Sequence, residues 1–233
     1  MPAAKPKPAT PSGFAGFRPA ALTFFRDLAA NQERAWFQDN RAIYEQEVLA
    51  PLRALVADLG SAFSRRGVGL TADPLKSVFR IHRDVRFSRD KAPYKTHAGA
   101  VLSRDGGKGG FGIFYIHIDP TGSFAAAGFY QPDPKYLEAL RIAMFEEAPR
   151  LRAALDAAYA SGAELLREDA LTRLPRGFEH TAGTESADFV KLRHLVVRWP
   201  LPAKALAAPA LVGTLAGFGE AAKPLLAFGW DAI

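Results

Sequence analysis

The sequence contains no cysteine among its 233 residues. It therefore has no disulfide framework, no thiolate ligand for a metal and no cysteine nucleophile. This absence is compatible with a reducing compartment, and we expect a cytoplasmic protein. No apolar run approaches the roughly 18–20 residues that a membrane-spanning helix requires, so we expect no membrane partner.

Several motifs that carry well-known chemistry are also missing. The chain has no G-x-x-x-x-G-K-[ST] phosphate loop, no H-E-x-x-H zinc motif and no G-x-S-x-G nucleophile turn. The histidines show none of the spacings along the chain that are typical of metal ligands; they are His82, His97, His117, His180 and His194. The sequence thus gives no positive evidence for a metal or a cofactor, and we expect neither.

The apolar content is sufficient for a folded core, since 48% of the residues are hydrophobic and 17 are Phe. Residues 1–13 hold four prolines and two lysines among small residues, a composition that predicts a disordered tail. No apolar stretch follows these lysines, so we do not expect a secretory signal. We expect one globular domain over residues 14–233.

The hydrophobic periodicity changes along the chain from helical to strand-like and back. This order predicts an α+β fold, with an antiparallel sheet of about four or five strands, helices packed on it, and helical N-terminal and C-terminal segments. Expected helices cover 19–31, 33–49, 51–67, 134–161 and 209–227, the last one weakened by Gly213, Gly217 and Gly219, and a helix or turn is expected at 186–193. Expected strands cover 78–84, 97–103, 111–119, 123–130, 165–167 and 195–199.

The charge is unevenly distributed. The chain has a net charge of +6, from 30 basic and 24 acidic residues. Residues 76–97 hold seven Lys or Arg against two acids, so this window alone carries +5. Such a cluster attracts anions, whether phosphates, nucleic acid or acidic small molecules.

The basic window contains a dense motif: an Arg, two spacers, Arg-Asp, a spacer, Arg-Phe, and later Asp-Lys and a Tyr. The residues that fill it are Arg80, Arg83, Asp84, Arg86, Phe87, Asp90, Lys91 and Tyr94. With this motif the sequence resembles the bacterial family catalogued as domain of unknown function 2461. The resemblance extends upstream over residues 31–44 and downstream over residues 174–178, and so covers nearly the whole chain from Phe14 onward. It implies no particular activity.

Arginine offers a planar fork of donors that matches phosphate and carboxylate. The motif can therefore form an anion site, in which its aspartates hold the cations in place and its tyrosine donates to a ligand oxygen. Upstream, a helical spacing of four places an asparagine between two aromatic residues on one face, where they can stack a planar ligand. The candidate ligand-binding residues are Arg80, Arg83, Asp84, Arg86, Asp90, Lys91, Tyr94, Trp36, Asn40 and Tyr44. The alternative for the charged motif is a salt-bridge network that stabilises a loop. The alternative for the upstream helix is ordinary packing of its aromatic residues.

Two histidines can face the basic residues. In the strand 111–119, alternation places Tyr115 and His117 opposite an apolar side. If residues 78–84 belong to the same sheet, His82 and His117 share a polar face with the first arginine of the motif. A histidine within reach of a substrate can act as a general acid or base near neutral pH, so His82, His117 and Tyr94 are the candidate catalytic residues. The alternative is that both histidines are half-exposed strand residues.

These observations support a site for a small phosphate- or carboxylate-bearing ligand, and they leave open whether the protein is an enzyme. The alternative function is a nucleic-acid-binding or accessory module that uses residues 76–97, with Phe87 and Tyr94 stacking on bases. A third hypothesis is that the protein is a scaffold in which the charged motif only stabilises the fold.

Overall fold

The computed structural model describes residues 13–233. It contains a five-stranded antiparallel sheet with the strand order β1-β2-β3-β5-β4. The strands are β1 Ala98–Ser103, β2 Ile113–Ile118, β3 Ser123–Phe129, β4 Glu164–Leu165 and β5 Leu195–Leu201. The predicted α+β class and the predicted antiparallel sheet are thus confirmed. The predicted tail at 1–13 lies outside the described residues, apart from Gly13.

Helices precede and follow these strands. They are α1 Pro19–Ala30, α2 Arg34–Asp39, α3 Arg41–Ile43, the π-helix η1 Tyr44–Leu49, α4 Ala50–Arg66, α5 Pro134–Glu146, α6 Ala148–Ala160, the 3₁₀-helix η2 Glu179–Thr181, α7 Ala187–Val190, α8 Ala203–Leu206, α9 Leu211–Ala221 and α10 Lys223–Asp231. Within residues 13–233, every helix is too short or too polar to cross a membrane.

Proline explains where the predicted long helices are divided. The expected helix at 134–161 is two helices, α5 and α6, and the expected helix at 209–227 is also two, α9 and α10. Proline stands in the first turn of α6 and of α10. This position tolerates proline because the first amide groups of a helix have no intrahelical acceptor.

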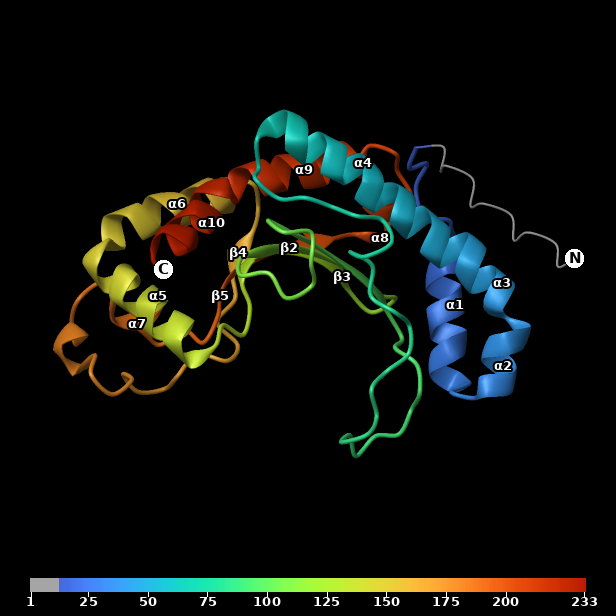
Figure 1. Cartoon of the computed structure of the whole chain (residues 1–233), viewed down its shortest axis with the longest axis horizontal. Coiled ribbons are helices and arrows are strands. Elements are labelled where there is room, and N and C mark those ends of the chain that lie inside the picture. Colours follow the sequence, from blue (N-terminus) through green and yellow to red (C-terminus); the bar gives the residue numbers. More distant parts are fainter. Residues whose placement is uncertain (1–12) are drawn as a thin grey trace, which may run out of the picture.

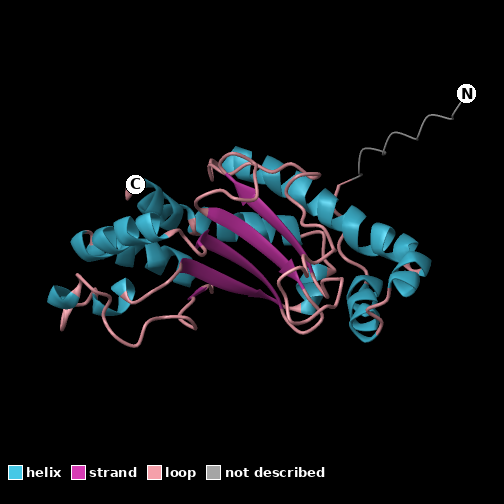
Figure 2. Cartoon of the chain, turned by 60° about the horizontal axis from the view of Figure 1, so that its bottom comes forward, coloured by secondary structure: helices cyan, strands magenta, loops and turns pink. Residues whose placement is uncertain are grey.

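Helices cover one face of the sheet. Phe114, Ile116 and Ile118 of β2 are fully buried on that face. The Phe114 ring packs against Phe63 of α4 and Phe218 of α9, with ring centroids 5.1 Å and 5.4 Å away. Figure 1 shows α4, α9, α10 and α6 along one side of the strands. In the turned view of Figure 2 the strands lie in front of these helices, so the opposite face of the sheet is left open.

The expected strand at 78–84 is wrong, because this segment divides its hydrogen bonds between two partners. The Phe79 amide donates to the Gly99 carbonyl at 2.9 Å, which places the start of the segment along the outer edge of β1. The chain then turns away, and the Lys95 amide donates to the Ile81 carbonyl at 2.8 Å. Residues 83–93 consequently form an arm that extends away from the sheet in Figure 1.

The expected helix at 33–49 is also divided. It consists of α2, α3 and η1, and α4 follows directly. Pro51 lies in the first turn of α4. In an uninterrupted α-helix its ring would clash with the carbonyl of Glu47, and the wider π-helical turn just before it relieves that clash.

Glycine in α9 permits close packing rather than simply weakening the helix. A Cβ atom at Gly219 would lie 2.5 Å from the ring of Phe63, which is fully buried in α4. A Cβ atom at Gly217 of the same helix would meet nothing within 4 Å. An alanine at Gly217 would therefore change only the helix propensity of α9, whereas an alanine at Gly219 would also change its packing against α4.

We expect Gly219→Ala to lower the free energy of unfolding by about 1–3 kcal/mol, because the added methyl group overpacks the contact between α9 and α4. Gly217→Ala is the matched control and should raise it by about 0.5–1 kcal/mol, because alanine favours a helix more than glycine does. Urea denaturation of both variants measures the difference. Equal stability of the two would contradict the tight approach of α9 to α4.

Candidate functional site

The open face of the sheet is hollowed into a cleft of about 820 Å³, which we call the sheet cleft. Small residues on this face, Gly99, Ala126 and Gly128, form part of its floor. A Cβ atom at Gly99 would lie 2.7 Å from the Tyr115 hydroxyl, so glycine makes room for this ring on the neighbouring strand. The volume lies in the usual range for small-molecule sites.

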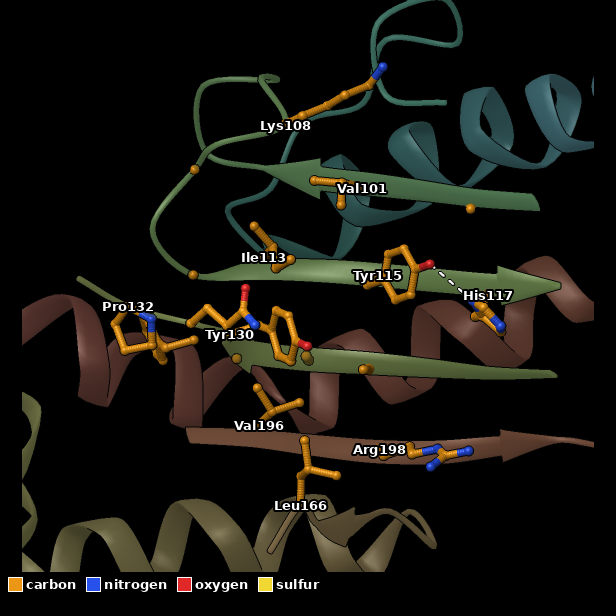
Figure 3. Close-up of a pocket in the computed structure, with 18 of the residues that line it drawn as sticks. Val101, Lys108, Ile113, Tyr115, His117, Tyr130, Pro132, Leu166, Val196 and Arg198 are labelled. Carbon is orange, nitrogen blue, oxygen red and sulfur yellow. Dashed lines mark hydrogen bonds between the residues drawn. The ribbon is translucent and has the colours of Figure 1, made fainter. Parts of the chain in front are cut away.

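Polar and aromatic side chains gather at one end of the sheet cleft. The Tyr115 hydroxyl forms a hydrogen bond with Nδ1 of His117 at 3.0 Å. The His117 ring stacks on Phe124 of β3, with centroids 4.6 Å apart. Figure 3 shows this pair on β2 and Arg198 on β5 at the same end of the sheet. The alternation predicted for β2 is confirmed, since Tyr115 and His117 both lie opposite its apolar side.

The protonation of these groups is strongly affected by burial. Burial, together with the nearby His97, lowers the pKa of His117 to about 4. Burial and the neighbouring Lys95 also lower the pKa of His97. Burial raises the pKa of Tyr115 to about 12. At neutral pH both imidazoles are therefore neutral and the phenol keeps its proton.

A second hollow of about 610 Å³, which we call the basic hollow, adjoins the sheet cleft and shares Phe79, Lys95 and Lys108 with it. Its charged lining consists of five cations and one acid: Arg41, Arg53, Arg80, Lys95, Lys108 and Glu45. Arg41 and Glu45 pair with each other at 2.7 Å. Within residues 13–233, the other four cations have no carboxylate partner.

The arginine from α4 has a buried nitrogen atom without a partner among residues 13–233. The Nε atom of Arg53 is buried and has no hydrogen-bond partner within the described part of the chain. Its neighbour Tyr44, in the π-helical turn η1, has a pKa that burial raises and Arg53 acts to lower. A buried donor without an acceptor is costly, so it marks a place where a ligand atom would be stabilising.

The two lysines crowd together over one aromatic ring. The Nζ atoms of Lys95 and Lys108 lie 5.0 Å and 5.2 Å from the centroid of the Phe79 ring. Burial lowers the pKa of Lys95, and the positive charges of Arg80 and Lys108 lower it further. Like charges held this close repel each other, and a bound anion would relieve the repulsion.

The other charges of the sequence motif stabilise the protruding arm. Arg83 donates to Asp90 at 2.5 Å and to the Ala92 carbonyl at 3.2 Å. Arg86 donates to Asp84 at 2.6 Å and 3.0 Å, and this hydrogen bond lowers the pKa of Asp84. The Lys91 ammonium donates to the Val85 carbonyl at 3.0 Å. These cations are already occupied by partners within the arm.

The structure therefore separates the predicted site residues into groups. Tyr44, Arg80 and His82 line the basic hollow, and His117 lines the sheet cleft. The expected shared face of His82 and His117 is not formed, because the chain leaves the edge of the sheet before residue 82. The predicted residues that line neither hollow are Trp36, Asn40, Arg83, Asp84, Arg86, Asp90, Lys91 and Tyr94.

Three of these predicted residues take part in local packing. The buried Tyr94 ring stacks on Phe37 with centroids 4.5 Å apart, and Trp36 packs on Phe24 at 5.8 Å. The Asn40 amide donates to the Trp36 carbonyl at 2.9 Å. Tyr94 thus packs against Phe37, which itself lines the basic hollow.

Sequence reasoning did not single out Arg53, Lys108 or Arg198, and it passed over His97 and Asp119. Arg53 lies in the first turn of α4, directly after η1, and lines the basic hollow. The pairing of Ala98 with Ile118 in β1 and β2, continued by one residue, sets His97 opposite Asp119. An antiparallel pairing of the expected strands 97–103 and 111–119 is the sequence signal that would have placed His97 opposite Asp119.

The histidine titration is open to direct measurement. We expect the His117 ring to titrate near pH 4 in a ¹³C-edited NMR titration, with His117→Gln used for assignment. The folded pKa lies below the unfolded value of about 6.5, so the unfolded state binds more protons between these limits. This group should therefore lower stability as the pH falls from about 6.5 towards 4. A midpoint between pH 6 and 7 would contradict the burial of this ring.

Comparison with family models matches residues 20–228 to the family described as conserved hypothetical protein (DUF2461). No curated protein and no solved structure matches the chain.

Proposed function

The chain belongs to the DUF2461 family, and from the site that its residues form we propose that it binds a small ligand bearing a phosphate or a carboxylate. The anionic group binds in the basic hollow. The observation that carries this proposal is the set of four cations, Arg53, Arg80, Lys95 and Lys108, that face one hollow with no carboxylate partner within residues 13–233.

The energetic argument is that this arrangement is unfavourable without a ligand. Lys95 is partly buried, and the positive charges of Arg80 and Lys108 lower its pKa; the Arg53 Nε atom is buried without an acceptor within the described residues. An anion with several oxygen atoms can accept hydrogen bonds from several of these donors at once. Charge-assisted hydrogen bonds of this kind contribute about 1.5–3 kcal/mol each.

The body of the ligand extends into the sheet cleft. The two hollows share Phe79, Lys95 and Lys108, so a molecule held by its anionic group in one reaches the other. The cleft beyond is lined mainly by aromatic and small side chains, among them Tyr115 and Phe124. An anionic group attached to a planar or apolar body fits this combination. His82 in the basic hollow and His117 in the cleft are then the candidate acid–base groups.

The test is isothermal titration calorimetry with inorganic phosphate, pyrophosphate, nucleoside monophosphates and aromatic carboxylates. We expect saturable binding of at least one of these probes at one site per chain. Arg80→Gln should weaken that binding by about 10- to 100-fold, because it removes a charge-assisted hydrogen bond. Arg89→Gln is the matched control and should leave the affinity within twofold, because Arg89 lies on the arm and lines neither hollow.

Three outcomes would overturn the proposal: no binding by any probe, an equal loss in both variants, or a loss of stability in Arg80→Gln with unchanged affinity. The last of these would show that the basic residues mainly stabilise the fold. Thermal melts of each variant, run beside the calorimetry, separate it from a true binding defect.

A second candidate function is favoured by one observation on the arm. The Phe87 side chain is 96% exposed, and the Arg86 guanidinium lies 5.8 Å from the centroid of its ring. An exposed aromatic ring beside cations is typical of surfaces that stack nucleic-acid bases. Binding of a short single-stranded oligonucleotide that falls steeply with salt, and is lost in Phe87→Ala, would favour this function. Arg80→Gln would then have no greater effect than Arg89→Gln.

A further inference from the structure

Three side chains with metal-binding chemistry converge at the end of the sheet cleft. His97 immediately precedes β1, His117 lies in β2, and Asp119 follows β2. One ligand atom from each residue lies within 4.8 Å of the other two. Oδ2 of Asp119 is 3.7 Å from Nε2 of His117. Ligand atoms around a tetrahedral zinc ion are about 3.4 Å apart, so binding would draw these atoms together by up to about 1.4 Å.

The remaining atoms of two of these residues are already held by other groups. Asp119 accepts hydrogen bonds at Oδ1 from the Thr121 amide at 2.7 Å and the Thr121 hydroxyl at 2.6 Å, which leaves Oδ2 facing His117. Nδ1 of His117 is bonded to the Tyr115 hydroxyl, which leaves Nε2 facing Asp119. Outer partners of this kind orient metal ligands and are a regular feature of metal sites.

The cluster is largely shielded from solvent and lies beside two cations. The side chains of His117 and Asp119 are only 16% and 15% exposed. Burial lowers the pKa of both histidines. The charged groups that face the cluster are Lys95 beside His97 and Arg198 beside His117. These cations disfavour a bare metal ion but favour an anion that completes its coordination.

We propose that His97, His117 and Asp119 bind one divalent transition-metal ion through two imidazole nitrogens and one carboxylate oxygen. The remaining coordination positions face the sheet cleft and are open to water or to an anionic ligand. Two nitrogen donors and one oxygen donor suit Zn²⁺, Co²⁺ or Fe²⁺, whereas Mg²⁺ and Ca²⁺ prefer oxygen ligands throughout. With the metal on Nε2 of His117, Nδ1 carries the ring proton, and this N–H donates a hydrogen bond to the Tyr115 oxygen. The observations behind this inference are separate from those behind the proposed anion binding.

The experiment titrates the full-length chain, after chelator treatment and dialysis into phosphate-free buffer, with Zn²⁺ by calorimetry and with Co²⁺ by visible absorption. We expect one ion per chain, a Co²⁺ spectrum with nitrogen and oxygen ligands, and no binding of Mg²⁺. His97→Gln should weaken Zn²⁺ binding at least about 100-fold. Thr121→Ala should weaken it by about 10- to 100-fold, because it removes one of the two hydrogen bonds that orient Asp119.

The matched control is His82→Gln, which removes a histidine in the basic hollow that is not part of the cluster. Its Zn²⁺ affinity should stay within twofold of wild type, and so should that of Arg80→Gln. Equal Zn²⁺ affinity in wild type and His97→Gln would overturn the proposal, and an equal loss in His82→Gln would show adventitious binding at surface histidines. If His97→Gln melts at a much lower temperature than wild type, the Zn²⁺ affinity of Thr121→Ala is the test of the proposal, because the Thr121 side chain is exposed and lies outside the core.

The experiments distinguish failure of the proposed anion site from failure of the proposed metal site. Loss of phosphate binding in Arg80→Gln with normal Zn²⁺ binding supports the basic hollow alone. Normal phosphate binding in the metal-free protein, with no Zn²⁺ bound at the cluster, leaves the anion site intact and removes the metal site.

Discussion

Packing of the apolar side of β2 against α4 and α9 determines which side chains are left to face outward. Phe114 lies between Phe63 and Phe218, and no polar side chain could replace it there without losing these contacts. Because side chains alternate along a strand, burying this side forces Tyr115 and His117 to the opposite face. A slip of one residue would bury the histidine and expose the phenylalanine, so the hydrophobic contact also fixes the register of the site.

The opposite face is open but is not an ordinary solvated surface. A half-buried antiparallel sheet normally presents polar side chains to water. Here the cleft is lined by Phe79, Tyr115 and Phe124, with glycine and alanine between them. The small residues create the depth and the aromatic residues supply the walls. Apolar surface that a chain leaves hollow and uncovered is more typical of a binding site than of a surface that only contacts water.

The periodicity predicted an antiparallel sheet and the outward face of β2, because strand alternation and hairpin turns depend on residues that are close in sequence. It did not predict the strand order, in which β5 pairs with β3 across a long stretch of chain. It could not predict that residues 78–84 leave β1 partway, since that depends on competition between the sheet edge and the partner segment near Lys95. The cations of the motif looked equivalent in sequence. Only their partners distinguish Arg83, which is paired with Asp90, from Arg80, which has no carboxylate partner within residues 13–233. The cluster around His97 escaped a search for ligand spacing because its members meet across two strands.

The connection between the two hollows follows from the position of Lys95. Its ammonium group lies over Phe79, a residue that lines both hollows, and its charge interacts with Arg80, Lys108 and His97. An anion at this boundary would reduce the repulsion among the three cations. The same negative charge would offset the unfavourable field that Lys95 exerts on a metal ion at His97. Two sites that act on one charged group are energetically coupled, and such coupling is reciprocal. An anionic group placed between the two sites would therefore pair with the cations of the basic hollow and also complete the coordination sphere of a metal ion at His97.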